Sequence, residues 1–209
     1  MRRWIIVCCP LIVMFILSGF AFKPFNVEVP EPLKVKEPTN VLFPKSKTEI
    51  KDLELMPPFA GVSFTGFKEA LAFKESKGNY FAVNTFGYLG KYQFGINTLQ
   101  LMGVNDEQQF LESPELQEKV FQLNIARNKW ILRRDIKRFV GKRIRGIEIT
   151  ESGIIAAAHL AGAGNVKRYL RSLGQTDVID DFGSSITHYI KEFSGYDISI
   201  ILPERNARL

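Results

Sequence analysis

The chain has 209 residues, of which 45% are hydrophobic and 24% charged, as in a globular domain with additional segments. Its formal net charge of +6 favours anionic partners such as acidic lipids, cell-wall polymers or nucleic acid. The only cysteines are the adjacent Cys8 and Cys9, and there are two histidines. This composition excludes a disulfide framework and gives no support to a Cys- or His-based metal site, so we expect no metal and no cofactor.

Residues 1–22 have the pattern of an N-terminal signal or transmembrane segment. Arg2 and Arg3 precede an apolar run from Trp4 to Phe22, which is long for a signal-peptide core and suits a membrane span. Residues 19–21 are compatible with a cleavage site, so anchored and secreted forms both remain open. The position of the arginines predicts export to the cell envelope, either anchored in the inner membrane and facing outward or released after cleavage.

Residues 23–58 differ in composition from both neighbouring segments. They hold seven of the ten prolines: Pro24, Pro30, Pro32, Pro38, Pro44, Pro57 and Pro58. Proline removes backbone donors and favours extended structure, so this segment is predicted to be a semi-rigid linker. A spacer of this kind suits a domain that acts at a distance from the membrane.

Residues 59–209 are predicted to form one mainly α domain with a small β or irregular insert after its first helix. The first helix is expected from a Thr65 cap to a stop near Gly78, followed by an insert over 79–94 in which Gly87 and Gly90 interrupt regular structure. Further helices are expected over 96–102, 114–132 and 151–160, from about Asn165, and after Ser184 or Ser185, with Thr150 as a cap.

One acidic residue has an unusual position in the first predicted helix. Phe67, Leu71 and Glu75 are spaced by four residues, so they lie along one stripe that is apolar except for Glu75. Burial at this edge and the negative end of the helix dipole would both raise the carboxyl pKa. A protonated acid is what glycosidic-bond cleavage requires. A solvent-facing Glu at a frayed helix end is the alternative, and the stripe alone favours it.

Three motifs that follow one another along the chain favour the catalytic interpretation of Glu75 over the solvent-facing one. Glu75-Ser76 ends a helix, Gly87, Gly90 and Gln93 form a Gly-x-x-Gly-x-x-Gln turn, and the segment AAHLAGAGNVKRYL follows at 157–170. Together they resemble the soluble lytic transglycosylase and goose-type lysozyme families over about residues 64–196. The third motif departs from the family pattern, because His159 and Leu160 replace a Tyr and an Asn.

The resemblance implies a lysozyme-like domain that cleaves peptidoglycan, with Glu75 as the catalytic acid and base. It also implies a substrate-binding cleft, formed by Ser76, Gly90, Tyr92, Gln93, His159 and Tyr189. The family Tyr usually hydrogen-bonds the catalytic carboxyl. His159 can donate in its place, although a charged imidazole would lower the Glu75 pKa. Tyr189 is the least secure of these matches, and a packing role has equal support.

The type of reaction follows from the carboxylates near Glu75. Residues 76–105 contain no Asp or Glu, which argues against a second carboxylate from the insert. This fits the family's lytic transglycosylase reaction, in which one Glu cleaves the MurNAc–GlcNAc bond and an anhydro sugar forms. Two alternatives remain. One is a hydrolytic muramidase that uses a distant carboxylate from the set Glu148, Glu151, Asp180 and Asp181. The other is an inactive peptidoglycan-binding scaffold.

A basic segment predicts a further partner. Residues 127–145 hold nine basic residues and one acid, Asp135, with Trp130 and Phe139 among them. Nucleic acid is disfavoured because an exported chain seldom meets it, and a solvated charged face is the simplest interpretation. Anionic wall polymers or stem-peptide carboxylates are the alternative partners. The sequence does not indicate whether the chain also binds a protein machine of the cell envelope.

Overall fold

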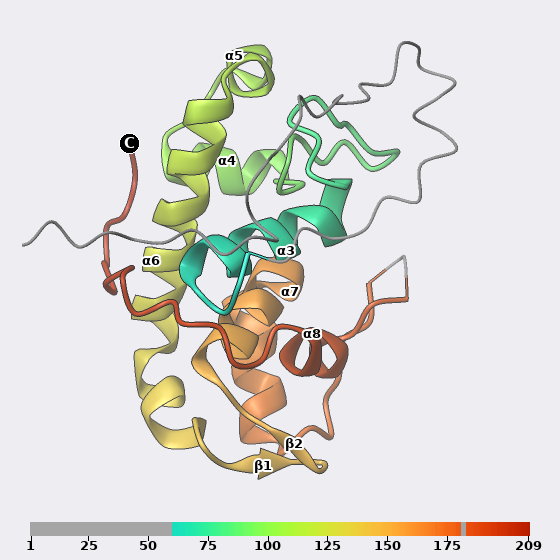
Figure 1. Cartoon of the computed structure of the whole chain (residues 1–209), viewed down its shortest axis with the longest axis vertical. Coiled ribbons are helices and arrows are strands. Elements are labelled where there is room, and N and C mark those ends of the chain that lie inside the picture. The colour runs from blue at the N-terminus through green and yellow to red at the C-terminus, as the bar shows by residue number, and fades with distance from the viewer. Residues whose placement is uncertain (1–59, 181–182) are drawn as a thin grey trace, which may run out of the picture. The chain divides into compact units, whose positions relative to one another are not determined.

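The computed structural model describes residues 60–180 and 183–209, which belong to one compact unit. The predicted N-terminal segment (1–22), the linker (23–58) and the first residue of the predicted domain lie outside the described residues. The described part contains six helices and one two-stranded antiparallel sheet (Figure 1). The prediction of a mainly α domain with little β structure is therefore confirmed.

Helix α3 (Phe64–Ser76) carries Glu75 in its last turn. It begins two residues before the prediction, because Ser63 rather than Thr65 caps it and its side chain accepts from the Gly66 N–H. It ends at Ser76, and the cap Lys77 has a left-handed backbone (φ 59°), so that the N–H groups of Lys77 and Gly78 donate to the carbonyl oxygens of Phe73 and Ala72. Phe67 and Leu71 on its buried face are 0% and 1% exposed, so the predicted apolar stripe packs into the core.

The predicted insert, expected over 79–94, consists of turns and single β-bridges. Leu89 pairs with both Val83 and Phe94, and Gly87 and Gly90 adopt positive φ angles as expected of chain breakers. The strands β1 (Arg143–Ile144) and β2 (Ile147–Glu148) lie elsewhere, in a hairpin whose turn is Arg145-Gly146, both with positive φ. The predicted position of the β structure was thus only partly right.

Three helices follow the insert. They are α4 (Ile96–Met102), α5 (Glu107–Glu112) and α6 (Pro114–Phe139). The prediction for α4 is confirmed at both ends, with Gly103 as the left-handed cap. Helix α6 is longer than predicted and α5 was missed, although Asp106 caps α5 through a bond from the Gln109 N–H.

Helices α7 (Glu151–Arg171) and α8 (Ile186–Glu192) complete the unit. Thr150 and Ser185 cap them, as predicted. A kink at Gly162 (φ 78°, ψ 150°) divides α7 where a break between two helices was expected. This backbone conformation is open almost only to glycine. Helix α7 packs against α6 and α8 and carries a run of small buried residues, so it forms the centre of the core (Figure 1). Within the described residues, no helix is both long enough and apolar enough to cross a membrane.

Candidate active site

Glu75 lies in a pocket where the end of α3 meets the insert, helix α7 and the segment before α8. The pocket has a volume of about 100 Å³. Its lining residues come from four separate parts of the chain and are Glu75, Asn84, Phe86, Tyr88, Gln93, His159, Leu160 and Asp180. Three of the predicted site residues, Glu75, Gln93 and His159, are therefore brought together around one cavity.

The environment of Glu75 keeps its carboxyl group protonated to a higher pH than usual. Burial is the largest cause and raises the pKa, and the nearby charge of Asp180 acts in the same direction. His159, a hydrogen bond from Tyr189 and the charge of Lys74 oppose this change without cancelling it. The predicted rise of the Glu75 pKa is confirmed, and the alternative of a solvent-facing Glu is wrong.

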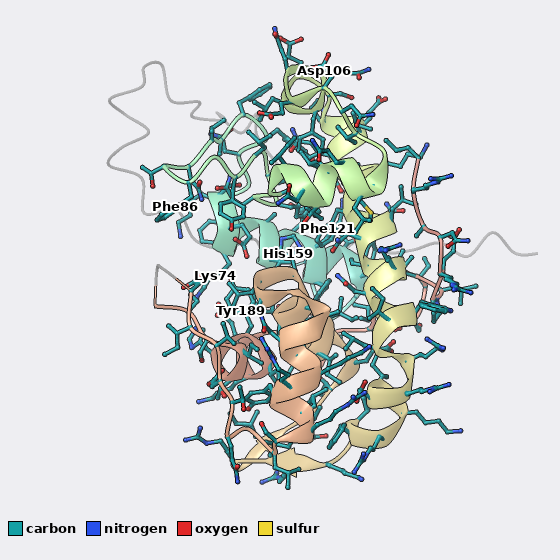
Figure 2. All side chains as sticks on the ribbon, turned by 180° about the vertical axis from the view of Figure 1, so that it is seen from behind. Lys74, Phe86, Asp106, Phe121, His159 and Tyr189 are labelled. Carbon is teal, nitrogen blue, oxygen red and sulfur yellow. The ribbon has the colours of Figure 1, made fainter. Side chains whose placement is uncertain are left out.

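Tyr189 is the direct hydrogen-bond partner of Glu75. It projects from α8, is 2% exposed, and its hydroxyl donates to Glu75 Oε1 at 2.8 Å (Figure 2). Burial, together with the carboxylate of Glu75, raises the pKa of the Tyr189 hydroxyl, so it remains a donor. Tyr189 was predicted as a substrate-binding residue on a weak match, and the structure places it against the carboxyl group.

His159 lines the pocket from α7 but hydrogen-bonds elsewhere. Its Nε2 lies 2.7 Å from the carbonyl oxygen of Tyr92. Because a carbonyl only accepts, Nε2 carries the proton and donates. The ring packs edge-on against Phe94, with 5.1 Å between centroids. The hydrogen bond that was considered between His159 and Glu75 is made by Tyr189 instead, and His159 ties α7 to the insert.

Ser76, Gly90 and Gln93 shape the insert beside Glu75. The Ser76 hydroxyl donates to the Lys91 carbonyl oxygen at 2.7 Å and accepts from the Asn79 N–H. The Gln93 side chain donates to the Gly90 carbonyl oxygen at 2.9 Å while its backbone is left-handed (φ 50°). Gly90 also has positive φ, and an added Cβ would collide with the Gln117 side chain. The left-handed backbone and this contact both favour glycine at position 90, and its role in substrate binding stays a prediction.

Tyr92 supports the site from the core. Its side chain is 0% exposed, stacks on Phe121 at 3.8 Å, and donates from its hydroxyl to Glu118 at 3.0 Å. A fully buried side chain offers no surface to a ligand. The prediction that Tyr92 binds substrate therefore needs correction: it positions the insert through packing and through its carbonyl bond from His159.

Sequence reasoning missed several residues of the pocket. Phe86 and Tyr88 are 56% and 44% exposed and stand at its edge, and Asn84 holds their backbone N–H groups through its side-chain oxygen. The aromatic residues of the insert were a usable signal for these positions. Asp180 had been considered only as one of several distant acids, and nothing in the local sequence shows that it shares a pocket with Glu75.

Within residues 60–180 and 183–209, no group of three or more His, Cys, Asp or Glu side chains is arranged to hold a metal ion. Comparisons with protein-family models, with curated proteins and with solved structures gave no match to this chain.

Proposed function

We propose that this protein is a peptidoglycan-cleaving enzyme of the lysozyme-like type, acting as a lytic transglycosylase with Glu75 as its general acid and base. The observation that carries the proposal is the Glu75 carboxyl group: it has a raised pKa, faces a pocket and accepts a hydrogen bond from a buried tyrosine. The Glu75–Ser76 pair, the 87–93 turn and the 157–170 segment, whose order resembles that of the family, support the same reaction.

The reaction would use one carboxyl group twice. Protonated Glu75 donates its proton to the glycosidic oxygen, the bond from that oxygen to C1 of the muramic acid breaks, and positive charge develops at C1. The Glu75 carboxylate then accepts the proton of the C6 hydroxyl as its oxygen bonds to C1, which gives a 1,6-anhydro sugar and restores the acid. The Tyr189 hydroxyl, at 2.8 Å, would hold the carboxyl group in place and stabilise its charged form between the two steps.

Asp180 favours a second candidate, a hydrolytic muramidase on the same site. It lines the same pocket as Glu75, and its charge acts on the Glu75 carboxyl. A second carboxylate beside the acid can activate a water molecule that attacks C1, as in hydrolysing glycosidases. The acid-free stretch from 76 to 105, which disfavoured hydrolysis, does not exclude it, because the second carboxylate comes from a segment far along the chain. An inactive peptidoglycan-binding scaffold is the remaining alternative.

A zymogram with peptidoglycan as the substrate tests whether the chain is an enzyme. The full-length protein is expected to clear the gel, and Glu75→Gln, which keeps the shape of the side chain, is expected to lose at least about a hundredfold in rate. Glu107→Gln, an exposed change on the surface of α5, serves as the matched control and should clear normally. Absence of clearing by the wild type would support the scaffold instead.

Mass spectrometry of the released fragments separates the two enzymatic reactions. Anhydro ends, lighter than reducing ends by one water, identify the transglycosylase, whereas reducing ends identify the hydrolase. The variant Asp180→Asn provides a second test that separates the two reactions. The transglycosylase needs no second carboxylate, so this variant should keep anhydro products, whereas a hydrolase should lose most of its turnover.

The N-terminal pattern agrees with this substrate. We propose that residues 1–22 export the chain, and that peptidoglycan is met on the outer side of the cytoplasmic membrane with the enzyme either anchored or released.

A further inference from the structure

We infer that the glycan groove ends in a subsite for a carboxylate, formed by Arg127 and Arg208, and that the enzyme therefore acts on strands that carry stem peptides. This inference rests on the proposed function, since it names a feature of the same substrate. It places the recognised anion at the opposite end of the groove from Glu75.

The hollows between Glu75 and the arginines adjoin one another. The pocket of Glu75 adjoins a larger one of about 360 Å³, and the two share Tyr88, Gln93, His159 and Leu160. The larger pocket adjoins a third, of about 320 Å³, through Leu101 and Arg127. Each neighbouring pair thus shares lining residues, and we refer to the three hollows together as the groove.

One face of α6 forms the floor of the middle part. Asn124, Arg127, Asn128 and Ile131 all line it, and their spacing of three, four and seven residues places them on one side of the helix. Residues of α4 and of α7 around the Gly162 kink line it as well. Apart from Arg127, no residue that lines the middle part is an Asp, Glu, Lys or Arg, so it suits a neutral, hydroxyl-rich chain such as a glycan.

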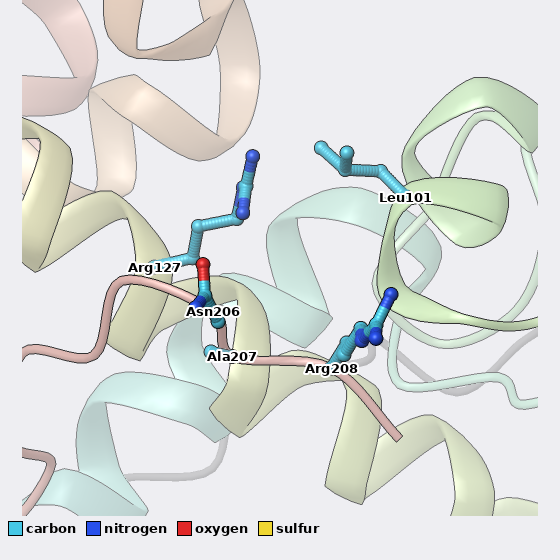
Figure 3. A pocket seen from close by; sticks show the side chains of 5 residues that line it. All are labelled: Leu101, Arg127, Asn206, Ala207 and Arg208. Atoms are coloured by element: carbon cyan, nitrogen blue, oxygen red, sulfur yellow. The ribbon is translucent and has the colours of Figure 1, made fainter.

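The far end of the groove is basic. Arg127 comes from α6, Leu101 from α4, and Asn206 and Arg208 from the segment after α8, and together they surround the third hollow (Figure 3). Arg127 Nη1 donates to the Arg205 carbonyl oxygen at 3.2 Å, whereas its Nε is buried without a hydrogen-bond partner among the described residues. This nitrogen has no accessible surface, so a carboxylate in the hollow would be bound by the terminal guanidinium nitrogens of Arg127 and Arg208.

The two arginines at this end, Arg127 and Arg208, form no ion pair with the described part of the chain. The groove therefore runs from two acids, Glu75 and Asp180, to two arginines. Guanidinium groups bind carboxylates through paired hydrogen bonds. The stem peptides of peptidoglycan supply such carboxylates on an otherwise neutral glycan, which matches this distribution of charge.

The preference for strands with free peptide carboxylates tests the inference. The full-length protein is given glycan strands with their peptides, or the same strands after carbodiimide and ammonia have converted the peptide carboxylates to neutral amides, and kcat/KM is measured on both. We expect the ratio of the two values to fall about tenfold in Arg127→Gln/Arg208→Gln, because two charge-assisted contacts are lost. Arg134→Gln/Lys137→Gln removes the same charge from the exposed face of α6 and should leave the ratio unchanged.

Binding separates failure of the inference from failure of the proposed function. Isothermal titration of Glu75→Gln with both kinds of strand needs no turnover, and strands with free peptide carboxylates should bind about tenfold more tightly. This preference should disappear when Arg208→Gln is added, a change at an exposed position that spares the buried part of Arg127. Equal binding of both strands, or a preference that survives the loss of Arg208, would overturn the subsite even if the enzyme is active. Inactive protein with an intact preference would instead overturn the proposed catalysis.

Discussion

The carboxyl group of Glu75 is held between opposing influences. Its position at the end of α3 removes water from it, and Asp180 adds a like charge, so both favour the protonated form. The Tyr189 hydroxyl favours the charged form. In the proposed reaction Glu75 gives up a proton and takes it back, which requires that both states be within reach.

Tyr189→Phe tests this balance. The change removes one hydroxyl and keeps the ring that packs on Phe193. Without the hydrogen bond, the carboxylate loses a stabilising partner, so the Glu75 pKa rises further and the alkaline limb of the pH–rate profile moves to higher pH. We expect kcat to fall about tenfold at the optimum, because the carboxyl group is also less well held. Measurement of kcat against pH for the wild type and the variant gives both the shift of the alkaline limb and the change in kcat at the optimum.

Tyr196→Phe is the matched control, because this tyrosine contacts Phe67 in the core rather than Glu75. Its pH profile should match that of the wild type. An alkaline limb that stays in place in Tyr189→Phe would show that the hydroxyl does not act on Glu75.

At the scale of elements, a cluster of charged side chains connects α3, the insert and α6. Its members are Lys68, Glu69, Lys91 and Glu118. Lys91 is 4% exposed and binds Glu69 at 2.8 Å and Glu118 at 2.9 Å, while Lys68 binds Glu118 at 2.7 Å. Burial alone would raise the pKa of the Glu118 carboxyl, but hydrogen bonds from Lys68, Tyr80 and Lys91 outweigh it and lower the pKa to about 2. Since the carbonyl oxygen of Lys91 accepts from Ser76, the cluster fixes the insert beside Glu75.

The cluster predicts how stability depends on pH. Glu118 has a folded-state pKa below its usual 4.5, so its contribution is present above about pH 4.5 and is lost as the pH falls toward 2. Glu118→Gln should lower the free energy of unfolding at pH 7 by on the order of 2 kcal/mol. Urea unfolding at a series of pH values should show this difference shrinking below pH 4.5. The exposed Glu115→Gln on the same helix should change little, and a difference that is independent of pH would contradict the assignment.

The sequence predicted local structure better than distant contacts. Gly103 predicted the end of α4, and Thr150 and Ser185 predicted the starts of α7 and α8, because each of these residues stands beside an apolar run. The structure confirms all three positions. The spacing of Glu75 with Phe67 and Leu71 raised its burial as a hypothesis but by itself favoured a solvent-facing side chain, because the burial depends on distant segments such as the one that carries Tyr189. The bonds of Tyr189 to Glu75 and of His159 to Tyr92 join residues 114 and 67 positions apart, and no local pattern encodes such pairs. Tyr92 was misassigned because its motif shows its place in the turn but not the direction of its side chain.

At the scale of the whole molecule, the charges on the chain have distinct places. The chain has a formal net charge of +6, and much of its positive charge lies within residues 127–145, which hold nine basic residues and one acid. This segment belongs to α6 and the β1–β2 hairpin. The candidate acids lie instead at the opposite end of the groove from Arg127. Basic groups that lie apart from the candidate acids suit a substrate that is anionic overall but neutral at the bond that is cleaved. The N-terminal pattern of arginines and apolar residues would bring that surface to the envelope.

Removal of residues 2–22 tests export at this scale. The full-length chain should fractionate with the cell envelope and be digested by protease added to spheroplasts, because two arginines followed by an apolar run direct the remainder outward. The shortened chain should stay in the cytosolic fraction and resist the protease. Immunoblots of both fractions give the result, and the size of the exported band shows whether the leader is retained as an anchor or cleaved.

Arg2→Glu/Arg3→Glu is the matched control, since it keeps the apolar run and alters only the flanking charge. Orientation depends on basic residues near the apolar segment, so this variant should remain with membranes but lose protease sensitivity in a substantial fraction of molecules. Full-length protein found only in the cytosol would contradict export and would separate the chain from peptidoglycan. The proposed substrate would then have to be reconsidered even if the purified enzyme clears a zymogram, because a catalytic site acts in the cell only where its substrate is present.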